Sequence, residues 1–270
     1  MERYIIPIVI VVGIGLVAGV ILTLAAKFMA VKENELAKKV RDVLPGANCG
    51  ACGYPGCDEY AKVIAEDHTV KPNLCTPGGS VVAKEISEVL GIDFESVEGK
   101  IAILKCAGSR EKTNYVMDYQ GFQSCSANKL FYNGRGACDK GCLGFGDCAL
   151  VCDYDAITVE NGIAVIDKNR CIGCGVCMKV CPNQLIELVP SDTRVMLRCS
   201  SHEGAGDTRK KCKIGCVACK LCIDQCKFDA IKMVDNLAVI DYEKCKNCGL
   251  CAKVCPRGVI KVLPRQKKIK

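Results

Sequence analysis

A cysteine-bearing unit occurs twice in this chain, at a fixed offset of 74 residues, the distance from Cys125 to Cys199. The offset carries nine cysteines of the first copy onto nine of the second: Cys125, Cys138, Cys142, Cys148, Cys152, Cys171, Cys174, Cys177 and Cys181 onto Cys199, Cys212, Cys216, Cys222, Cys226, Cys245, Cys248, Cys251 and Cys255. Residues 152–186 and 226–260 are identical at 17 of 35 positions. A repeat of this length indicates one supersecondary unit used twice. The fold must therefore contain two similar small units built around cysteine.

The composition leaves little material for ordinary apolar cores. The chain has 270 residues, with 24 cysteines, 26 glycines, no tryptophan and 5% aromatic residues. This length suits two or three small domains. Cysteine at this density indicates either a disulfide scaffold or a metal protein, and the redox state of the compartment decides between them.

The N-terminal segment predicts that compartment. The apolar run from Tyr4 to Ala26 has 23 residues and no charge, which is long enough for a membrane-spanning helix; a buried core helix is the alternative. No small-residue cleavage motif follows the run, so it does not resemble a cleaved signal. Basic residues are concentrated after the run, which predicts a single pass with the C-terminal bulk in the cytoplasm: Lys27, Lys32, Lys38, Lys39 and Arg41. In that reducing compartment the cysteines are expected to bind metal clusters rather than form disulfides.

The net charge of +7 is unevenly distributed. Residues 209–270 contain 16 Lys or Arg against 5 Asp or Glu, a charge of +11, so residues 1–208 carry −4. A basic face can steer an acidic partner, or it can lie solvated near anionic lipid. The basic residues are scattered among cysteines and are not grouped with stacking aromatics, so nucleic acid is not an expected partner.

The first cysteine group follows the N-terminal segment in the sequences NCGACGYPGC and LCTPGG. Its candidate ligands are Cys49, Cys52, Cys57 and Cys75. Zinc also accepts four thiolates. The glycine-rich loop with one remote fourth cysteine favours a [4Fe-4S] cluster, because flexible backbone can direct N–H groups at the sulfurs. A helix is predicted over residues 58–66.

Each repeat predicts two clusters. The run Cys171, Cys174, Cys177, Cys181 and Pro182 is typical of bacterial ferredoxins, in which three cysteines bind one cluster and the fourth binds the neighbouring cluster. The first repeat is assigned two ligand sets: Cys138, Cys142, Cys148 with Cys181, and Cys171, Cys174, Cys177 with Cys152. The second repeat is assigned two more: Cys216, Cys219, Cys222 with Cys255, and Cys245, Cys248, Cys251 with Cys226. A hairpin with Asn161-Gly162 at its turn is predicted between the runs of the first repeat.

Five clusters use 20 cysteines and leave four, which are candidates for a sixth: Cys106, Cys125, Cys199 and Cys212. A strand over residues 100–106 is expected to deliver Cys106. Cys219 has no counterpart in the first repeat because Phe145 occupies its place, so either Cys212 or Cys219 can belong to the fifth cluster. Free thiols are the alternative for the four.

The expected architecture is α+β: a transmembrane anchor (1–27), a linker helix (28–45), an N-terminal [4Fe-4S] domain (46–100) and two ferredoxin-like domains (101–190 and 191–270). No Ser–His–acid set, phosphate loop or dinucleotide motif is visible, and the only histidines are His68 and His202. Five or six [4Fe-4S] clusters without a substrate pocket indicate a one-electron relay, in which the protein positions the clusters and tunes their potentials.

The N-terminal helix, the NCGACGYPGC motif beyond it, the GCLGFGDC stretch at 141–148 and the following cysteine runs resemble the B subunits of Rnf complexes, the ion-translocating ferredoxin:NAD+ oxidoreductases. The resemblance implies a bacterial inner-membrane subunit without a catalytic site of its own. It would accept electrons from soluble ferredoxin and pass them to membrane and flavin subunits, where NAD+ reduction drives Na+ or H+ export. It also implies that the first three cysteine sets bind clusters.

By the same resemblance, the basic second repeat is expected to dock the acidic ferredoxin through Lys210, Lys211 and Lys213. Two alternatives stay open at this point. The chain can be an electron-transfer subunit of a hydrogenase or formate dehydrogenase, or a zinc-stabilised scaffold.

Overall fold

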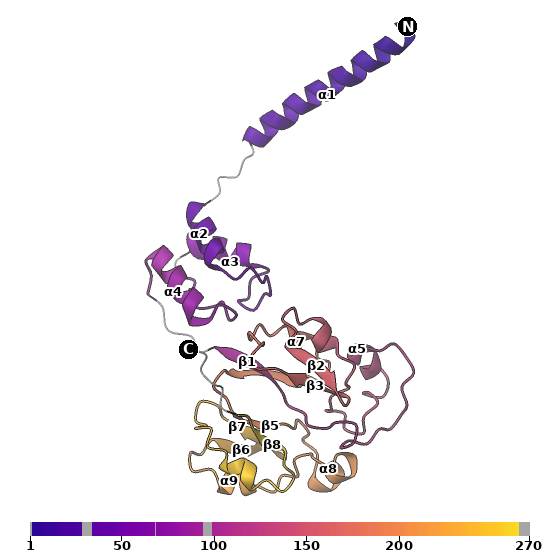
Figure 1. The fold of residues 1–270 in the computed structure, drawn as a ribbon, viewed down its shortest axis with the longest axis vertical. Coiled ribbons are helices and arrows are strands. Elements are labelled where there is room, and N and C mark those ends of the chain that lie inside the picture. The colour runs from indigo at the N-terminus through magenta and orange to yellow at the C-terminus, as the bar shows by residue number, and fades with distance from the viewer. Residues whose placement is uncertain (1, 29–33, 68, 94–98, 265–270) are drawn as a thin grey trace.

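The computed structural model describes residues 2–28, 34–67, 69–93 and 99–264, with the side chains of the first helix described for residues 12–25 only. The chain forms a long N-terminal helix, a unit of three helices and two small modules of mixed helix and strand (Figure 1). Helix α1 is Glu2–Phe28. Within the described residues, no helix meets the length and apolarity that a membrane crossing requires. The ends of the predicted span lie outside the described side chains, and the membrane anchor stays a prediction.

The helical unit consists of α2 (Glu35–Val43), α3 (Cys57–Glu66) and α4 (Gly79–Leu90). The Asn34 side chain caps α2 by accepting the Leu36 N–H, and Gly91 ends α4 in a left-handed conformation that glycine adopts without strain. Fully buried Val40, Tyr60, Ile64 and Ile86 form its core together with Cys57 and Cys75. Helix α2, within the predicted linker, is therefore part of this core.

The first module pairs two strands that are far apart in the sequence. Strand β1 (Lys100–Leu104) runs antiparallel to β4 (Ile186–Pro190), with Lys100 opposite Pro190 and Leu104 opposite Ile186. Between them lie the hairpin strands β2 (Ile157–Glu160) and β3 (Ile163–Ile166) and three short helices, α5 (Cys125–Lys129), α6 (Asp147–Leu150) and α7 (Val176–Val180). The predicted hairpin about Asn161-Gly162 is confirmed.

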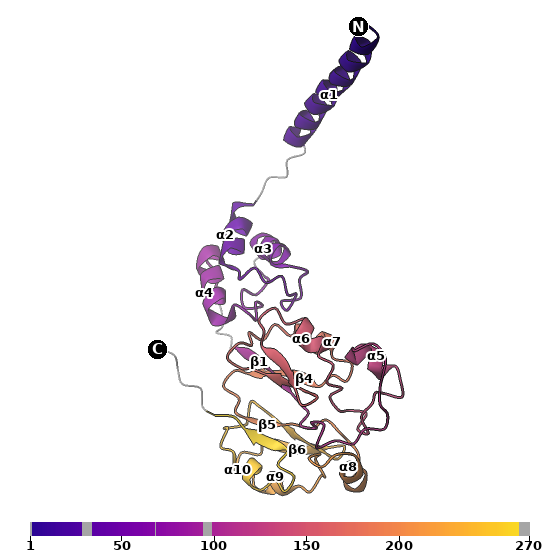
Figure 2. The same ribbon diagram turned by 45° about the vertical axis from the view of Figure 1, so that its right-hand side comes forward.

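The second module repeats this arrangement (Figure 2). Strand β5 (Val195–Leu197) pairs with β8 (Ile260–Val262), and β6 (Ile231–Val234) pairs with β7 (Leu237–Ile240). Its helices are α8 (Ala205–Lys211), α9 (Leu221–Asp224) and α10 (Leu250–Lys253). The second hairpin, α9 and α10 begin 74 residues after their counterparts β2, β3, α6 and α7 begin.

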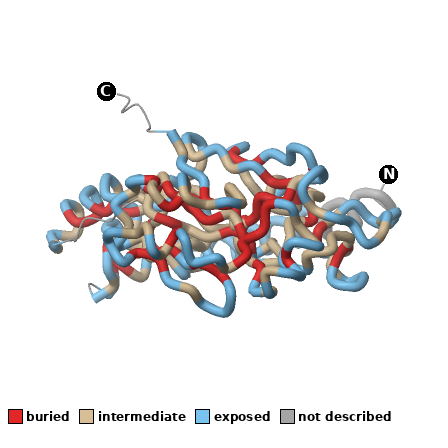
Figure 3. Tube along the Cα trace, turned by 90° about the horizontal axis from the view of Figure 1, so that it is seen from below, coloured by how far each residue is buried: buried red, intermediate tan, exposed pale blue. Residues whose placement is uncertain are grey.

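Cysteine is part of the core of both modules. In the first module, buried Cys106 and Cys177 pack with Leu104, Ile157 and Leu185. The second core holds four buried cysteines, Cys199, Cys216, Cys222 and Cys251. Figure 3 shows buried residues as short stretches along the trace, interrupted by exposed ones. Both modules thus place cysteine where other small domains place aliphatic side chains.

Candidate iron–sulfur cluster sites

Four cysteine loops share one backbone shape. Each loop turns through two left-handed residues, one on either side of its middle position. The pairs are Gly144 and Gly146, Gly173 and Gly175, Ala218 and Lys220, and Asn247 and Gly249. At Gly173 an added Cβ would collide with the Lys100 carbonyl, and at Gly144 with the Gly162 carbonyl. Glycine there lets the loop approach the backbone of the neighbouring strand or hairpin closely.

Four pockets lie at these loops, and each is lined by four cysteines. We name them by module and by distance from the junction of the modules. The first outer site has Cys152, Cys171, Cys174 and Cys177. The first inner site has Cys125, Cys142, Cys148 and Cys181. The second inner site has Cys216, Cys219, Cys222 and Cys255, and the second outer site has Cys226, Cys245, Cys248 and Cys251.

Three of these sets agree with the sequence-based grouping, and the first inner site differs from it. There Cys125 takes the place that the sequence assigned to Cys138. Cys138 instead lines a fifth pocket, together with Cys106, Cys199, Cys212 and Cys142, the last of which also lines the first inner site. The pocket linings thus differ from the sequence-based grouping at Cys125, which lies with the first inner site, and at Cys138, which lies in the fifth pocket. Of the two cysteines between which the sequence left the choice open, Cys219 lines the second inner pocket and Cys212 does not.

Phe145 and an insertion explain the exchange. Cys142 follows Cys106 by 36 residues, whereas Cys216 follows Cys199 by 17, so the first module carries 36 − 17 = 19 additional residues. Helix α5 lies in this longer connection and begins with Cys125. The Phe145 ring, at the position of Cys219, packs edge-on against Tyr119 and under the Arg135 guanidinium, 4.3 Å from its centroid. The insertion thus covers the aromatic ring and supplies the missing thiol.

Asp147 holds Cys125 in position. Its carboxylate accepts the N–H groups of Cys125 at 2.8 Å and Ser126 at 3.0 Å, and the hydroxyl of Ser124 at 2.9 Å. Partial burial would raise the pKa of Asp147, but these hydrogen bonds outweigh burial and lower it. Sequence reasoning missed this residue, because a single carboxylate beside a cysteine gives no pattern.

A further site, the N-terminal site, is formed by the first cysteine group. Burial raises the pKa of the Cys75 thiol, and the neighbouring thiols Cys57, Cys52 and Cys49 raise it further. The Asn48 side chain accepts the Cys57 N–H at 2.8 Å, which fixes the start of α3. The four cysteines of the sequence prediction are therefore neighbours around one loop and one helix N-terminus.

The surroundings of the sulfurs suit clusters. Backbone N–H groups point at Cys171 from Ala102 (3.3 Å) and at Cys181 from Leu185 (3.4 Å), the kind of hydrogen bond that tunes a cluster potential. Burial, followed by neighbouring thiols, raises the pKa of Cys148 and Cys177 to about 12. Such thiols become ligands only when a positive metal centre stabilises the thiolate.

The number of thiols at each site fits an iron–sulfur cluster. Among the described residues, no three Cys, His, Asp or Glu side chains are close enough together to coordinate one ion. A structural zinc ion needs all its ligands within about 2.3 Å of one point, whereas in a [4Fe-4S] cluster each thiolate binds a different iron. Each pocket is lined by four thiols, the number of ligands that a [4Fe-4S] cluster takes.

Family models match the same segments. A family described as "Putative Fe-S cluster" matches residues 44–77, which contain the N-terminal site. A family described as "4Fe-4S binding domain" matches residues 164–187 and 238–261, one segment in each module.

Relatives match nearly the whole chain. It is 38% identical over 266 residues to the B subunit of the proton-translocating ferredoxin:NAD(+) oxidoreductase complex of Clostridium ljungdahlii, covering 97% of this chain and 94% of the relative. It is 36% identical to the Na(+)-translocating counterpart of Acetobacterium woodii, covering 96% and 78%. It is 35% identical to the B subunit of the ion-translocating oxidoreductase complex of Methanosarcina acetivorans, covering 94% and 97%. The chain therefore belongs to the B subunits of ion-translocating ferredoxin:NAD+ oxidoreductase (Rnf) complexes, as an iron–sulfur subunit.

Proposed function

We propose that this subunit accepts electrons from reduced ferredoxin at its second module and conducts them, one at a time, to its N-terminal site. From there they pass to membrane and flavin subunits, where NAD+ reduction is coupled to export of Na+ or H+. [4Fe-4S] clusters supply the one-electron chemistry. The residues of the chain would hold these clusters one after another, determine the polarity around them and bind the electron donor, ferredoxin. The observation that carries the proposal is the set of five thiol sites, two in each module and one in the N-terminal unit.

Electrostatic contact between thiols supports this order. Burial raises the pKa of Cys174 in the first outer site, and Cys49 of the N-terminal site is among the thiols that raise it further. Cys148 of the first inner site is affected in the same way by Cys177 of the first outer site. In the second module, Cys222 of the inner site is affected by Cys251 of the outer site. These interactions link the N-terminal site to the first outer site, and the outer to the inner site within each module.

The exposed end of the second module is the proposed entry point. Of the 24 cysteines, only Cys219 and Cys248 are exposed. Exposed Lys220 follows the first of them, and exposed Lys246 lies two residues before the second. Positive charge beside an accessible cluster steers an acidic donor to the position from which transfer is shortest.

This assignment refines the sequence-based docking hypothesis. Lys211 forms an ion pair with Glu203, lines the pocket between the modules and is only half-exposed. Lys210 pairs with Asp207. Lys213, the third lysine of that hypothesis, is exposed at the junction of the modules, where its N–H donates to the Lys112 carbonyl. We place the ferredoxin contact instead at Lys220 and Lys246, beside the two exposed cysteines.

Helix α1 is the proposed anchor. Its described side chains, residues 12–25, contain no charge. The helix precedes the N-terminal site, so an anchor in the inner membrane would place that site beside the membrane subunits, with both modules on the cytoplasmic side.

The proposal is tested by following oxidation of reduced ferredoxin by the anaerobically purified subunit at increasing salt concentration. In the variant Lys220→Gln/Lys246→Gln, we expect slower association and a weaker salt dependence, because exposed charges act through long-range steering. Lys84→Gln, which removes an exposed charge from α4, is the matched control and should leave both unchanged. Equal rates and equal salt slopes in the double variant and the control would contradict the docking site.

A further inference from the structure

The two inner sites differ in the charge that surrounds their thiols. Among the described residues, the pocket of the second inner site is lined by two positive side chains, Lys220 and Arg257, and by no acidic one. The pocket of the first inner site is lined by one acidic side chain, Asp147, and by no positive one. The hydrogen bonds that Asp147 accepts favour its ionised form. Two sites with matching thiols therefore have surroundings of opposite charge.

Arg257 and Asn183 occupy equivalent positions in the two modules. Each lies two residues after the last cysteine of its inner site, and the two positions differ by the repeat offset of 74 residues. Each side chain donates to the carbonyl of the glycine in front of its cysteine loop. Arg257 Nε donates to Gly215 at 3.4 Å, and Asn183 Nδ2 donates to Gly141 at 2.6 Å. The same backbone contact is thus made by a charged side chain in one module and by a neutral one in the other.

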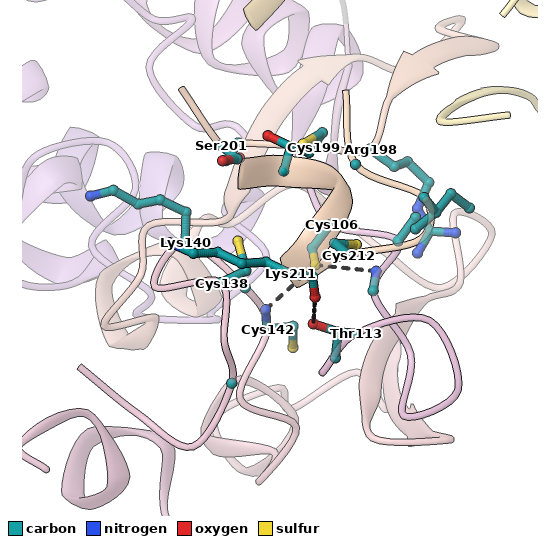
Figure 4. Close-up of a pocket in the computed structure, with 18 of the residues that line it drawn as sticks. Cys106, Thr113, Cys138, Lys140, Cys142, Arg198, Cys199, Ser201, Lys211 and Cys212 are labelled. Carbon is teal, nitrogen blue, oxygen red and sulfur yellow. Dashed lines mark hydrogen bonds between the residues drawn. The ribbon is translucent and has the colours of Figure 1, made fainter. Parts of the chain in front are cut away.

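The Arg257 charge is held at its pocket without a compensating carboxylate. A second hydrogen bond, from its Nη2 to the Cys212 carbonyl at 2.8 Å, fixes the guanidinium. Cys212 lines the pocket between the modules, which Figure 4 shows. Arg257 is only half-exposed, and it forms no ion pair within the described part of the chain. Because a guanidinium keeps its proton in proteins, this positive charge is permanent.

A half-buried charge at the pocket acts on a cluster more strongly than an exposed one. Reduction adds one negative charge to the cluster, so a nearby positive charge stabilises the reduced form and raises the reduction potential. Water and salt screen the exposed Lys220 charge more than that of Arg257. Asn183 has no charge, and its side-chain oxygen is buried without a hydrogen-bond partner among the described residues. Arg257 is therefore the side chain with the largest expected effect on the difference between the two sites.

We propose that Arg257 raises the reduction potential of the second inner cluster above that of the first inner cluster, where Asn183 takes its place. The consequence for electron transfer rests on the proposed function. One electron leaves reduced ferredoxin and reduces the second inner cluster, and no bond or proton changes. The higher potential favours this transfer, so the module that receives electrons is reduced before the module that passes them on.

A reciprocal exchange of the two side chains tests this role by redox titration of anaerobically purified full-length protein, followed by electron paramagnetic resonance. The signals that change in Cys219→Ser and Cys125→Ser identify the second and the first inner cluster. In Arg257→Asn, the ratio of reduced to oxidised second inner cluster at a fixed potential should fall about tenfold, which is 59 mV for one electron. Asn183→Arg should raise the same ratio for the first inner cluster. The double exchange, which keeps the net charge of the chain, should produce both shifts.

Two further variants separate the charge from other effects. Arg257→Lys retains the positive charge and should titrate like the wild type. Arg209→Asn makes the same chemical change on the exposed side of α8, outside the five cysteine pockets, and should leave all potentials unchanged. Iron per chain is measured in each variant, so that a shifted potential is distinguished from a lost cluster. Where one of the two exchange variants loses iron, the other decides.

Unchanged potentials in both exchange variants would overturn the role of Arg257, and so would equal shifts in Arg257→Asn and Arg209→Asn. The outcome is independent of the relay itself. Shifted potentials in a chain that does not oxidise ferredoxin would leave the role of Arg257 and remove the proposed function. Unchanged potentials in a chain that does oxidise ferredoxin would do the reverse.

Discussion

At the scale of single residues, the two inner sites obtain four thiols from different positions in the chain. The second inner site takes all three of its clustered cysteines from one loop, Cys216, Cys219 and Cys222. The first inner site has Phe145 at the middle position and receives Cys125 from α5. Because Gly144 and Gly146 keep the same left-handed backbone as Ala218 and Lys220, the loop retains the shape that a middle cysteine needs.

This equivalence makes a rescue experiment possible. Cys125→Ser should lower the iron content by about four per chain, since one cluster loses a ligand. Cys125→Ser/Phe145→Cys should restore it, because the new thiol occupies the position of Cys219. Phe145→Cys alone serves as the control and should keep full iron. A double variant that stays four irons short would show that the first loop cannot present a middle thiol.

At the scale of elements, local signals predicted the secondary structure well and pairing poorly. The helix predicted over 58–66 is α3, the strand at 100–106 contains β1, and the Asn161-Gly162 turn closes its hairpin. The helix, the strand and the turn are each determined by residues that are close together in the sequence. The pairing of β1 with β4 joins segments more than 80 residues apart, and no local pattern encodes it.

The grouping of the cysteines likewise depends on both local spacing and contacts between distant segments. The three regular runs lie together in the structure as predicted, because their spacing fixes their geometry. The two groupings differ at Cys125 and Cys138 because the sequence was interpreted as one altered run from Cys138 to Cys152, whereas in the structure Cys125 comes from α5, in the connection before that run. The offset also maps Cys125 onto Cys199, whereas the folds make Cys106 the counterpart of Cys199. The insertion in the first module placed an unrelated cysteine at the repeat distance, and only the strand positions reveal it.

Helix α1 is predicted to anchor the protein in the membrane. Removing residues 1–27 should move the protein from the membrane fraction to the soluble fraction, because a long apolar helix is costly to expose to water. Iron per chain should not change, since every cysteine lies after residue 48. Membrane fractionation and an iron assay check both parts. A full-length chain that is soluble in the absence of the other subunits would refute the anchor.

At the scale of the whole molecule, the cysteines that are candidate cluster ligands are also members of the protein core. Buried cysteines form part of each module core, packed among Leu and Ile side chains. The free energy of unfolding of a small domain is only about 5–15 kcal/mol. A core in which several residues are metal ligands loses much of this free energy when the metal is removed.

Removal of iron should therefore unfold the cysteine-bearing modules. After anaerobic treatment with an oxidant and a chelator, we expect the cooperative thermal transition of far-UV circular dichroism to disappear, because the buried thiols no longer bridge the loops. Reconstitution with iron and sulfide should restore the transition, which controls for irreversible damage. A cooperative melt that persists after complete iron loss would mean that apolar packing alone stabilises the modules, and that the cysteines contribute little to the stability of the core in which they lie.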